Sequence, residues 1–106
     1  MYTKARNPFL KKNKIKLKPG MIVSNEPGYY KEGSFGIRIE NLIYIKKDKF
    51  EELTMVPIEK SLIKIKMLNK KEIIWLNKYH TKVKKNLIKF MNPEEKVNLI
   101  DACSSI

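Results

Sequence analysis

The chain has 106 residues, with 23 lysines and arginines against 11 aspartates and glutamates, which gives a formal net charge of +12. This length suits one domain with a modest core, and the 42% hydrophobic content is that of a globular protein rather than a disordered one. The longest stretch without a charged residue covers residues 19–25, far short of the ~20 residues that span a bilayer.

The excess of lysine raises the question of nucleic-acid binding. Lysine supplies 21 of the 23 cations, and arginine occurs only as Arg6 and Arg38. Base-edge and bidentate phosphate contacts favour arginine, because its planar guanidinium donates two parallel hydrogen bonds. Lysines spread along a whole chain are more typical of a solvated surface. A small lysine-rich nucleic-acid-binding module therefore stays the alternative function rather than the leading one.

The first half of the chain predicts strands and turns. The apolar run 21–23 predicts a short strand, and the Glu-Pro-Gly sequence at 26–28 suits a type II turn. A second turn is expected at 31–33, and the isoleucine-rich residues 36–45 predict the strongest strand. Residues 48–52 are interpreted as a charged connection.

The second half of the chain turns helical after two short apolar runs between residues 53 and 65. Asn69 followed three residues later by Glu72 predicts a capping box, and apolar residues then recur at helical spacing over 73–90. Asparagine, proline and two acids predict a second helix over 92–102.

Two carboxylates stand in surroundings that are unusual for surface charges. Glu26 lies between an apolar strand and a rigid Pro-Gly sequence, and Glu40 lies in the isoleucine-rich strand, two residues after Arg38. A carboxylate buried in such a strand needs a cation, because an unpaired buried charge is costly. Arg38, on the same face, would give an ordinary ion pair with Glu40. A divalent metal such as Mn²⁺ or Mg²⁺ is the other candidate, although two carboxylates cannot complete its site.

The other residue types that carry chemistry favour structural roles. His80 lies in the apolar stripe of the first helix and is interpreted as a packed or hydrogen-bonded core residue rather than a ligand. Trp75 and Tyr79 are interpreted as packing aromatics. Cys103, the single cysteine, excludes an internal disulfide, fits a reducing compartment and lacks a neighbouring histidine that would favour a nucleophilic role.

The exact residue order of two motifs indicates a protein family more specifically than their composition does. Residues 17–30 read Leu-Lys-Pro-Gly-Met-Ile-Val-Ser-Asn-Glu-Pro-Gly-Tyr-Tyr, and residues 36–41 read Gly-Ile-Arg-Ile-Glu-Asn. In this order they resemble the end of the catalytic domain of aminopeptidase P, the Xaa-Pro aminopeptidase family. This family belongs to the creatinase and methionine-aminopeptidase superfamily, which has the pita-bread fold. The resemblance continues through 53–58 and into 75–80, which resembles the C-terminal extension of the same enzymes.

The resemblance implies an α+β fold. Residues 17–48 would supply antiparallel strands from the end of the pita-bread metallopeptidase domain, and residues 49–106 would supply a helical C-terminal extension. Residues 1–16 would form a poorly defined basic arm.

The resemblance also implies an activity and its residues. The family hydrolyses the bond between an N-terminal residue and a following proline, using two bridged divalent metal ions, most commonly Mn²⁺. Glu26 is implied to bind one metal and to shuttle a proton, and Glu40 is implied to bridge both metals. Arg38 is implied to be a catalytic arginine beside these ligands.

The family's two aspartate ligands and its histidine ligand have no counterpart in this chain. They precede the two glutamates in the family, whereas residues 1–18 contain no aspartate, glutamate or histidine. We therefore expect the chain to be the C-terminal portion of a cytoplasmic enzyme and to be inactive alone. The complete enzyme would act on peptides with proline at the second position. A separate upstream polypeptide and, in a homodimer, a second copy are candidate partners; nucleic acid and membrane are not expected.

Overall fold

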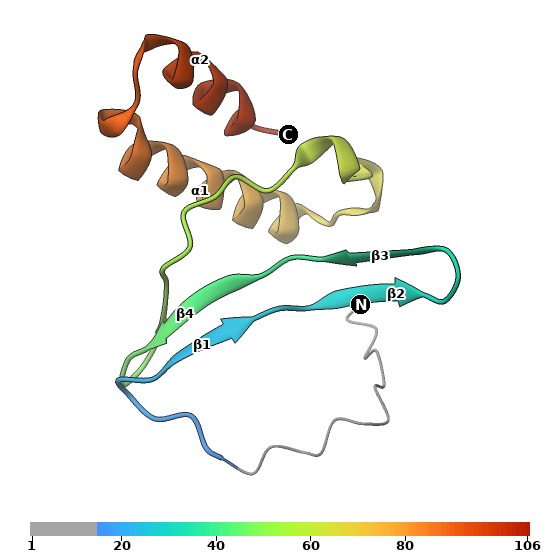
Figure 1. Ribbon diagram of the computed structural model, residues 1–106, viewed down its shortest axis with the longest axis vertical. Coiled ribbons are helices and arrows are strands. Elements are labelled where there is room, and N and C mark those ends of the chain that lie inside the picture. Colours follow the sequence, from blue (N-terminus) through green and yellow to red (C-terminus); the bar gives the residue numbers. More distant parts are fainter. Residues whose placement is uncertain (1–14) are drawn as a thin grey trace. The chain divides into compact units, whose positions relative to one another are not determined.

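The computed structural model describes residues 15–106, so the basic arm expected at 1–16 lies almost wholly outside the described residues. The described chain divides into two compact units, one ending at Thr54 and the other beginning at Met55 (Figure 1). Antiparallel strands form the first unit and helices form the second, so the expected α+β fold class is confirmed. None of the helices in residues 15–106 is both long enough and apolar enough to cross a membrane.

The first unit is built from antiparallel strands. Their bounds are β1 (Ile22–Asn25), β2 (Gly28–Lys31), β3 (Phe35–Arg38), β4 (Asn41–Ile45) and β5 (Phe50–Glu52). β4 pairs with β1 on one side and β5 on the other, and β2 pairs with β3. Gly33, in the turn between β2 and β3, has a φ of 66°, a conformation that favours glycine. The charged connection expected at 48–52 instead contains β5, because Phe50 pairs with Ile45 of β4.

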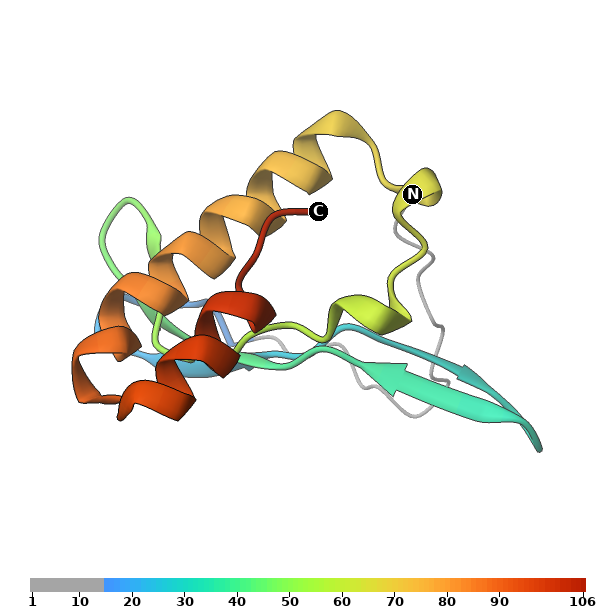
Figure 2. The same cartoon turned by 90° about the horizontal axis from the view of Figure 1, so that it is seen from above.

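The two ladders β1–β4 and β2–β3 form one long hairpin (Figures 1 and 2). Two residues separate the ladders on each strand, so the register continues without an insertion. Across this break the Ile39 N–H donates to the Pro27 carbonyl at 3.2 Å, but Pro27 has no N–H to return a bond. The proline therefore interrupts the ladder without turning the chain. The type II turn expected at 26–28 is therefore wrong. The strand expected at 36–45 is present but divided into β3 and β4 by residues 39–40.

The second unit contains α1 (Lys70–Leu87) and α2 (Pro93–Ala102), with short 3₁₀ segments at 60–62, 65–67 and 88–90. The Asn69 side chain accepts a hydrogen bond from the Glu72 N–H at 3.0 Å, and the Glu72 carboxylate accepts one from the Asn69 N–H at 2.8 Å. The same exchange occurs at the start of α2. Each box satisfies backbone donors that a helix start leaves without partners, and both predicted caps are confirmed.

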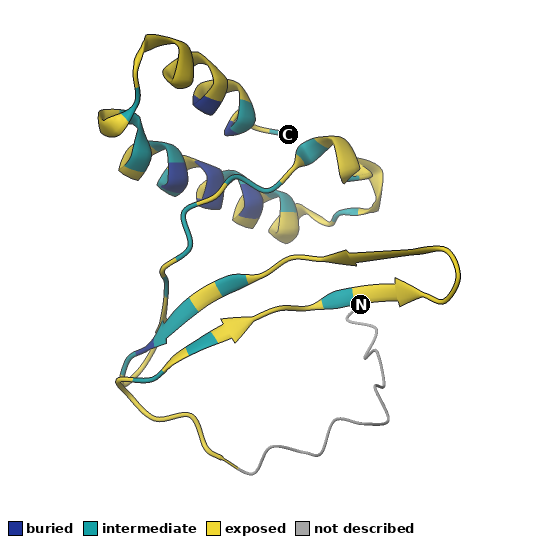
Figure 3. Ribbon diagram, viewed as in Figure 1, coloured by how far each residue is buried: buried dark blue, intermediate teal, exposed yellow. Residues whose placement is uncertain are grey.

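The core of the second unit lies between the two helices (Figure 3). Its buried members come from α1 and from the end of α2, and they are Tyr79, Val83, Leu99 and Cys103. Trp75 is half-exposed and stacks on Tyr79, with 5.6 Å between ring centroids, as expected of a packing aromatic. Burial raises the pKa of the Cys103 thiol, which disfavours the thiolate that a nucleophile needs.

Lys60 fastens the first 3₁₀ segment to the end of α2. Its Nζ donates to the Asp101 carbonyl at 2.8 Å, to the Ser104 carbonyl at 3.2 Å and to the Ser104 hydroxyl. The last turn of α2 contains no basic residue of its own. Lys60 therefore supplies the positive charge that favours a helix C-terminus.

His80 is fully buried in α1, where the Ile58 N–H donates to its Nε2 at 3.1 Å. A neutral imidazole whose Nε2 accepts carries its proton on Nδ1, and this atom has no hydrogen-bond partner within residues 15–106. The interpretation of His80 as a hydrogen-bonded core residue is confirmed. Desolvation and the positive charge of Lys60 lower the pKa of His80, so the ring is neutral in the folded chain at pH 7.

The lowered pKa of His80 predicts a loss of stability in mild acid. An unfolded histidine titrates near ~6.5, so below this pH the unfolded chain binds a proton that the folded chain does not. As the pH is lowered below this value, the free energy of unfolding should decrease by at most about 1.4 kcal/mol per pH unit. The decrease should stop once the pH reaches the pKa of His80 in the folded chain. Urea unfolding followed by Trp75 fluorescence would measure this. Above pH 5, the free energy of unfolding of His80→Gln should no longer depend on pH in this way. If the pH dependence were unchanged in that variant, it would arise from groups other than His80.

Candidate active site

Polar side chains gather on one face of the hairpin where its two ladders meet. Side chains alternate between faces along a strand, and residues directly opposite in antiparallel strands share a face. Continuing the register of the ladders into the break places Glu26 opposite Glu40. Ser24 and Arg38 lie two residues from these glutamates and share their face. The three residues predicted from sequence, Glu26, Arg38 and Glu40, are thus brought together.

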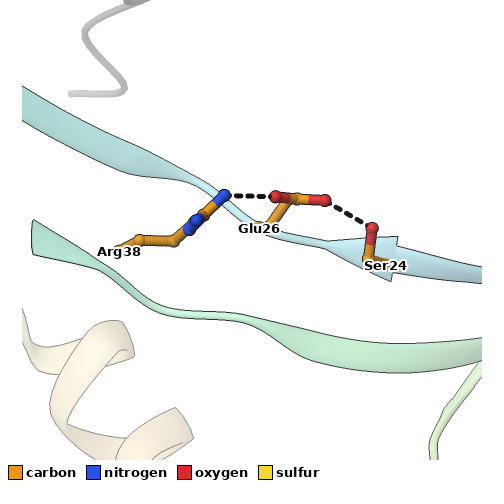
Figure 4. A network of polar contacts seen from close by, with 3 residues as sticks. All are labelled: Ser24, Glu26 and Arg38. Carbon is orange, nitrogen blue, oxygen red and sulfur yellow. Dashed lines mark hydrogen bonds and ion pairs between the residues drawn. The ribbon is translucent and has the colours of Figure 1, made fainter.

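Each oxygen of the Glu26 carboxylate accepts a hydrogen bond (Figure 4). The Ser24 hydroxyl donates to Oε1 at 2.6 Å, and Arg38 Nη1 donates to Oε2 at 2.7 Å. The bond from Ser24 and then the bond from Arg38 lower the pKa of Glu26, so the carboxylate is ionised at neutral pH. A carboxylate has about four acceptor positions, so acceptor capacity remains for another ligand.

Arg38 pairs with Glu26 across the hairpin rather than with Glu40 along its own strand. The ordinary Arg38–Glu40 ion pair is therefore not the arrangement in the structure. Gly28 lies directly opposite Arg38 in the register of the β2–β3 ladder. Glu40 is exposed, so the cost of burying its charge, which motivated the expectation, does not arise. The Tyr30 phenol oxygen and then the Glu26 carboxylate raise the pKa of Arg38, and Glu40 contributes less.

Tyr30 and two glycines belong to the same face, although sequence reasoning gave them no role. A Cβ on Gly28 would lie 2.8 Å from Tyr30 Cε2, and one on Gly36 would lie 2.6 Å from Tyr30 Cδ1. The ring therefore lies directly over both glycines, beside Arg38. The sequence did contain a signal, because glycine within a strand often marks a close approach by another group.

This packing predicts that Gly36→Ala will displace the Tyr30 ring. Overpacking typically costs about 1–3 kcal/mol, and the half-exposed ring can swing away, so we expect the lower end of that range. Hydrogen exchange of the β2 and β3 amides would measure the loss. In a Tyr30→Ala background the same substitution should cost much less, giving a coupling of at least about 0.5 kcal/mol. Strictly additive effects would show that the ring does not contact Gly36.

The opposed carboxylates suit a divalent metal ion in chemistry but not in number. Like charges directly opposite each other destabilise a sheet, and the Arg38 guanidinium is the positive charge that pairs with Glu26 on this face. Their oxygens are the hard donors that Mn²⁺ and Mg²⁺ prefer. Within residues 15–106, however, no three histidine, cysteine, aspartate or glutamate side chains gather in a way that could hold a metal ion. Further ligands would have to come from outside the described residues.

Comparison with known families extends this interpretation. Residues 2–47 match the family described as "Metallopeptidase family M24", and residues 48–106 match the "C-terminal region of peptidase_M24". The second match alone covers more than half of the chain. The chain belongs to metallopeptidase family M24, and the resemblance inferred from the motifs is confirmed.

Named relatives narrow the comparison. The chain is 48% identical over 83 residues to "Probable Xaa-Pro aminopeptidase P" of Tuber melanosporum, covering 67% of this chain and 13% of the relative. It is 42% identical over 83 residues to "Aminopeptidase P2" of Arabidopsis thaliana, covering 67% of this chain and 12% of the relative. The crystal structure of X-prolyl aminopeptidase from Caenorhabditis elegans, a cytosolic enzyme with a di-nuclear active site, matches with a TM-score of 0.71 and 34% identity. That match covers 85% of this chain and 17% of the enzyme, so the chain spans less than a fifth of each of these proteins.

Proposed function

We propose that the chain acts as the C-terminal part of a metal-dependent Xaa-Pro aminopeptidase, which hydrolyses the bond between an N-terminal residue and a following proline. The observation that carries this proposal is the opposed pair Glu26 and Glu40, with Arg38 beside them on one hairpin face. Membership of family M24 and relatives named Xaa-Pro aminopeptidase support it. A cytoplasmic location is proposed with it, since the C. elegans enzyme is described as cytosolic.

The roles of the three residues follow from their charges and positions. Glu26 and Glu40 would contribute ligands to two divalent ions, for which we propose Mn²⁺, with Glu40 shared between the ions. Metal ions bound there would polarise the scissile carbonyl and supply an activated water. The hydrogen bonds from Ser24 and then Arg38 lower the pKa of Glu26, so Glu26 is present as the anion that a metal ion binds. A role of Glu26 in shuttling a proton is proposed from the family resemblance.

We further propose that the chain is inactive until other donors complete this site. The resemblance implies two aspartates and one histidine, and two carboxylates alone are fewer ligands than such metals require. A separate upstream polypeptide is our first candidate for supplying these donors, and a homodimer is compatible with this arrangement. The substrates would be peptides with proline at the second position.

Co-expression tests this proposal directly. The chain would be produced together with a polypeptide that carries the preceding part of an M24 metallopeptidase domain. Release of the first residue from an Xaa-Pro-Xaa peptide would then be measured with added Mn²⁺. We expect turnover by the co-purified pair, little on a peptide with alanine in place of proline, and none by the chain alone.

Two results would count against the proposal. Failure of the two polypeptides to co-purify would contradict the supply of donors from a separate chain. Clear turnover by the 106-residue chain alone, abolished by Glu40→Ala, would show that the chain completes its own site.

A further inference from the structure

Ser24 makes a hydrogen bond to Glu26 that neither the motif interpretation nor the family match accounts for. Its hydroxyl lies 2.6 Å from Glu26 Oε1, on the oxygen that Arg38 does not hold. We propose that Ser24 is a positioning residue that fixes the orientation of the Glu26 carboxylate. This inference rests on the proposed function, in which the orientation of Glu26 matters for its role as a ligand.

The backbone places Ser24 where it can do this. Ser24 lies within β1 and Glu26 follows β1 directly, so the two side chains leave the same face of the hairpin two positions apart. A hydroxyl has one donor hydrogen that rotates to meet its acceptor. A separation of 2.6 Å is typical of a charge-assisted O–H···O⁻ bond, which is stronger than a bond between neutral groups.

Arg38 alone would hold Glu26 less firmly. Its guanidinium reaches Glu26 from the opposite strand on a long side chain that is 49% exposed. A single bond to Oε2 leaves the Glu26 side chain free to change rotamer, because the long Arg38 side chain can follow it. Ser24 and Arg38 approach the carboxylate from opposite sides, and bonds on both oxygens remove that freedom (Figure 4).

Glu40 is the other acidic residue on this face, directly opposite Glu26 when the register of the two ladders is continued. Like charges directly across an antiparallel pair repel each other, which favours movement of the Glu26 carboxylate away from Glu40. Ser24 opposes this movement without adding a charge to the face. Partners that orient metal ligands in this way commonly change metal affinity or activity by 10- to 100-fold when they are removed.

Side-chain NMR on the full metal-free chain tests the inference. Three-bond couplings at the Glu26 methylenes report whether the side chain occupies one rotamer or averages over several. We expect one dominant rotamer in the native chain, averaged couplings in Ser24→Ala, and recovery in Ser24→Thr, which restores the hydroxyl. Ser34→Ala, in the exposed turn between β2 and β3, is the matched control and should leave Glu26 unchanged.

The outcomes separate positioning from a general structural role. Cross-strand contacts between β1 and β4 amides establish that each variant keeps the hairpin. A single Glu26 rotamer in a folded Ser24→Ala chain would overturn the inference and leave Arg38 as the only restraint. If Ser24→Ala loses the hairpin, Ser24→Cys is measured instead, because cysteine is close to serine in shape but its thiol is a weak donor. A single Glu26 rotamer in a folded Ser24→Cys chain would also overturn the inference. The experiment contains no metal or peptide, so a negative result for Ser24 leaves the proposed peptidase function untouched. Likewise, a negative result in the co-expression assay leaves the NMR result for Ser24 untouched.

Discussion

Glu40→Gln is expected to abolish peptide hydrolysis by the completed enzyme while leaving the hairpin folded. Glutamine has nearly the same size but lacks the negative charge that a divalent ion needs. Transition-state stabilisation by bound metal is worth several kcal/mol, so we expect a loss on the order of 10³-fold in turnover. The measurement is release of the first residue from an Xaa-Pro-Xaa peptide by the co-purified pair with Mn²⁺. Glu32→Gln, in the exposed turn of the same hairpin, should retain activity within about twofold.

The stability of the same variant separates a functional charge from a structural one. Removing one of two opposed carboxylates relieves repulsion, so Glu40→Gln should keep or slightly increase the exchange protection of the β1 and β4 amides. The gain would be roughly 0.2–1 kcal/mol, the range of cross-strand charge pairs. If activity and protection fell together, Glu40 would be holding the sheet rather than serving the site.

The position of Glu26 directly opposite Glu40 could be predicted from the sequence only in part. The motifs identified both residues, but their juxtaposition depends on Pro27 interrupting the ladder without reversing the chain. Local rules assign a Pro-Gly pair to a turn, because proline fixes φ and glycine admits a positive φ. In this chain the cross-strand bond at Ile39 keeps the proline in an extended segment, and tertiary pairing decides the conformation.

The choice of partner for Arg38 shows the same limit. Spacing along one strand favours Glu40, whereas in the structure Arg38 crosses to the opposite strand and pairs with Glu26. By contrast, both helix starts were predicted correctly, because a capping box involves residues only three apart. β5 was missed for the opposite reason: its pairing with β4 is not encoded in its own three residues.

The net charge of +12 does not point to the candidate site. The charges that define the candidate site are two acids and one arginine out of the 34 charged residues, and all three lie on exposed positions of one hairpin. Composition sums over the whole surface and so cannot register a local pair of like charges. Only the register of the strands makes that pair visible.

Leu99→Ala is expected to have the largest effect on the stability of the second unit. Leu99 is 8% exposed and lies in the core cluster with Tyr79, Val83 and Cys103. Truncating a buried leucine costs about 2–5 kcal/mol, the sum of lost burial and the cavity that remains. A unit of this size has a total stability of only about 3–8 kcal/mol, so the variant should be unfolded or close to it at 25 °C.

Ile100→Ala is the matched control, because Ile100 is the next residue on α2 and its side chain is 48% exposed. Urea unfolding followed by Trp75 fluorescence should show a midpoint close to native for Ile100→Ala and a large decrease for Leu99→Ala. α2 has only ten residues, which is too short to be stable as an isolated helix. Its capping box and the bonds from Lys60 stabilise its two ends, and the buried contacts of Leu99 pack it against α1. Equal losses in the two variants would mean that the exposed face of α2 is also covered by protein in solution.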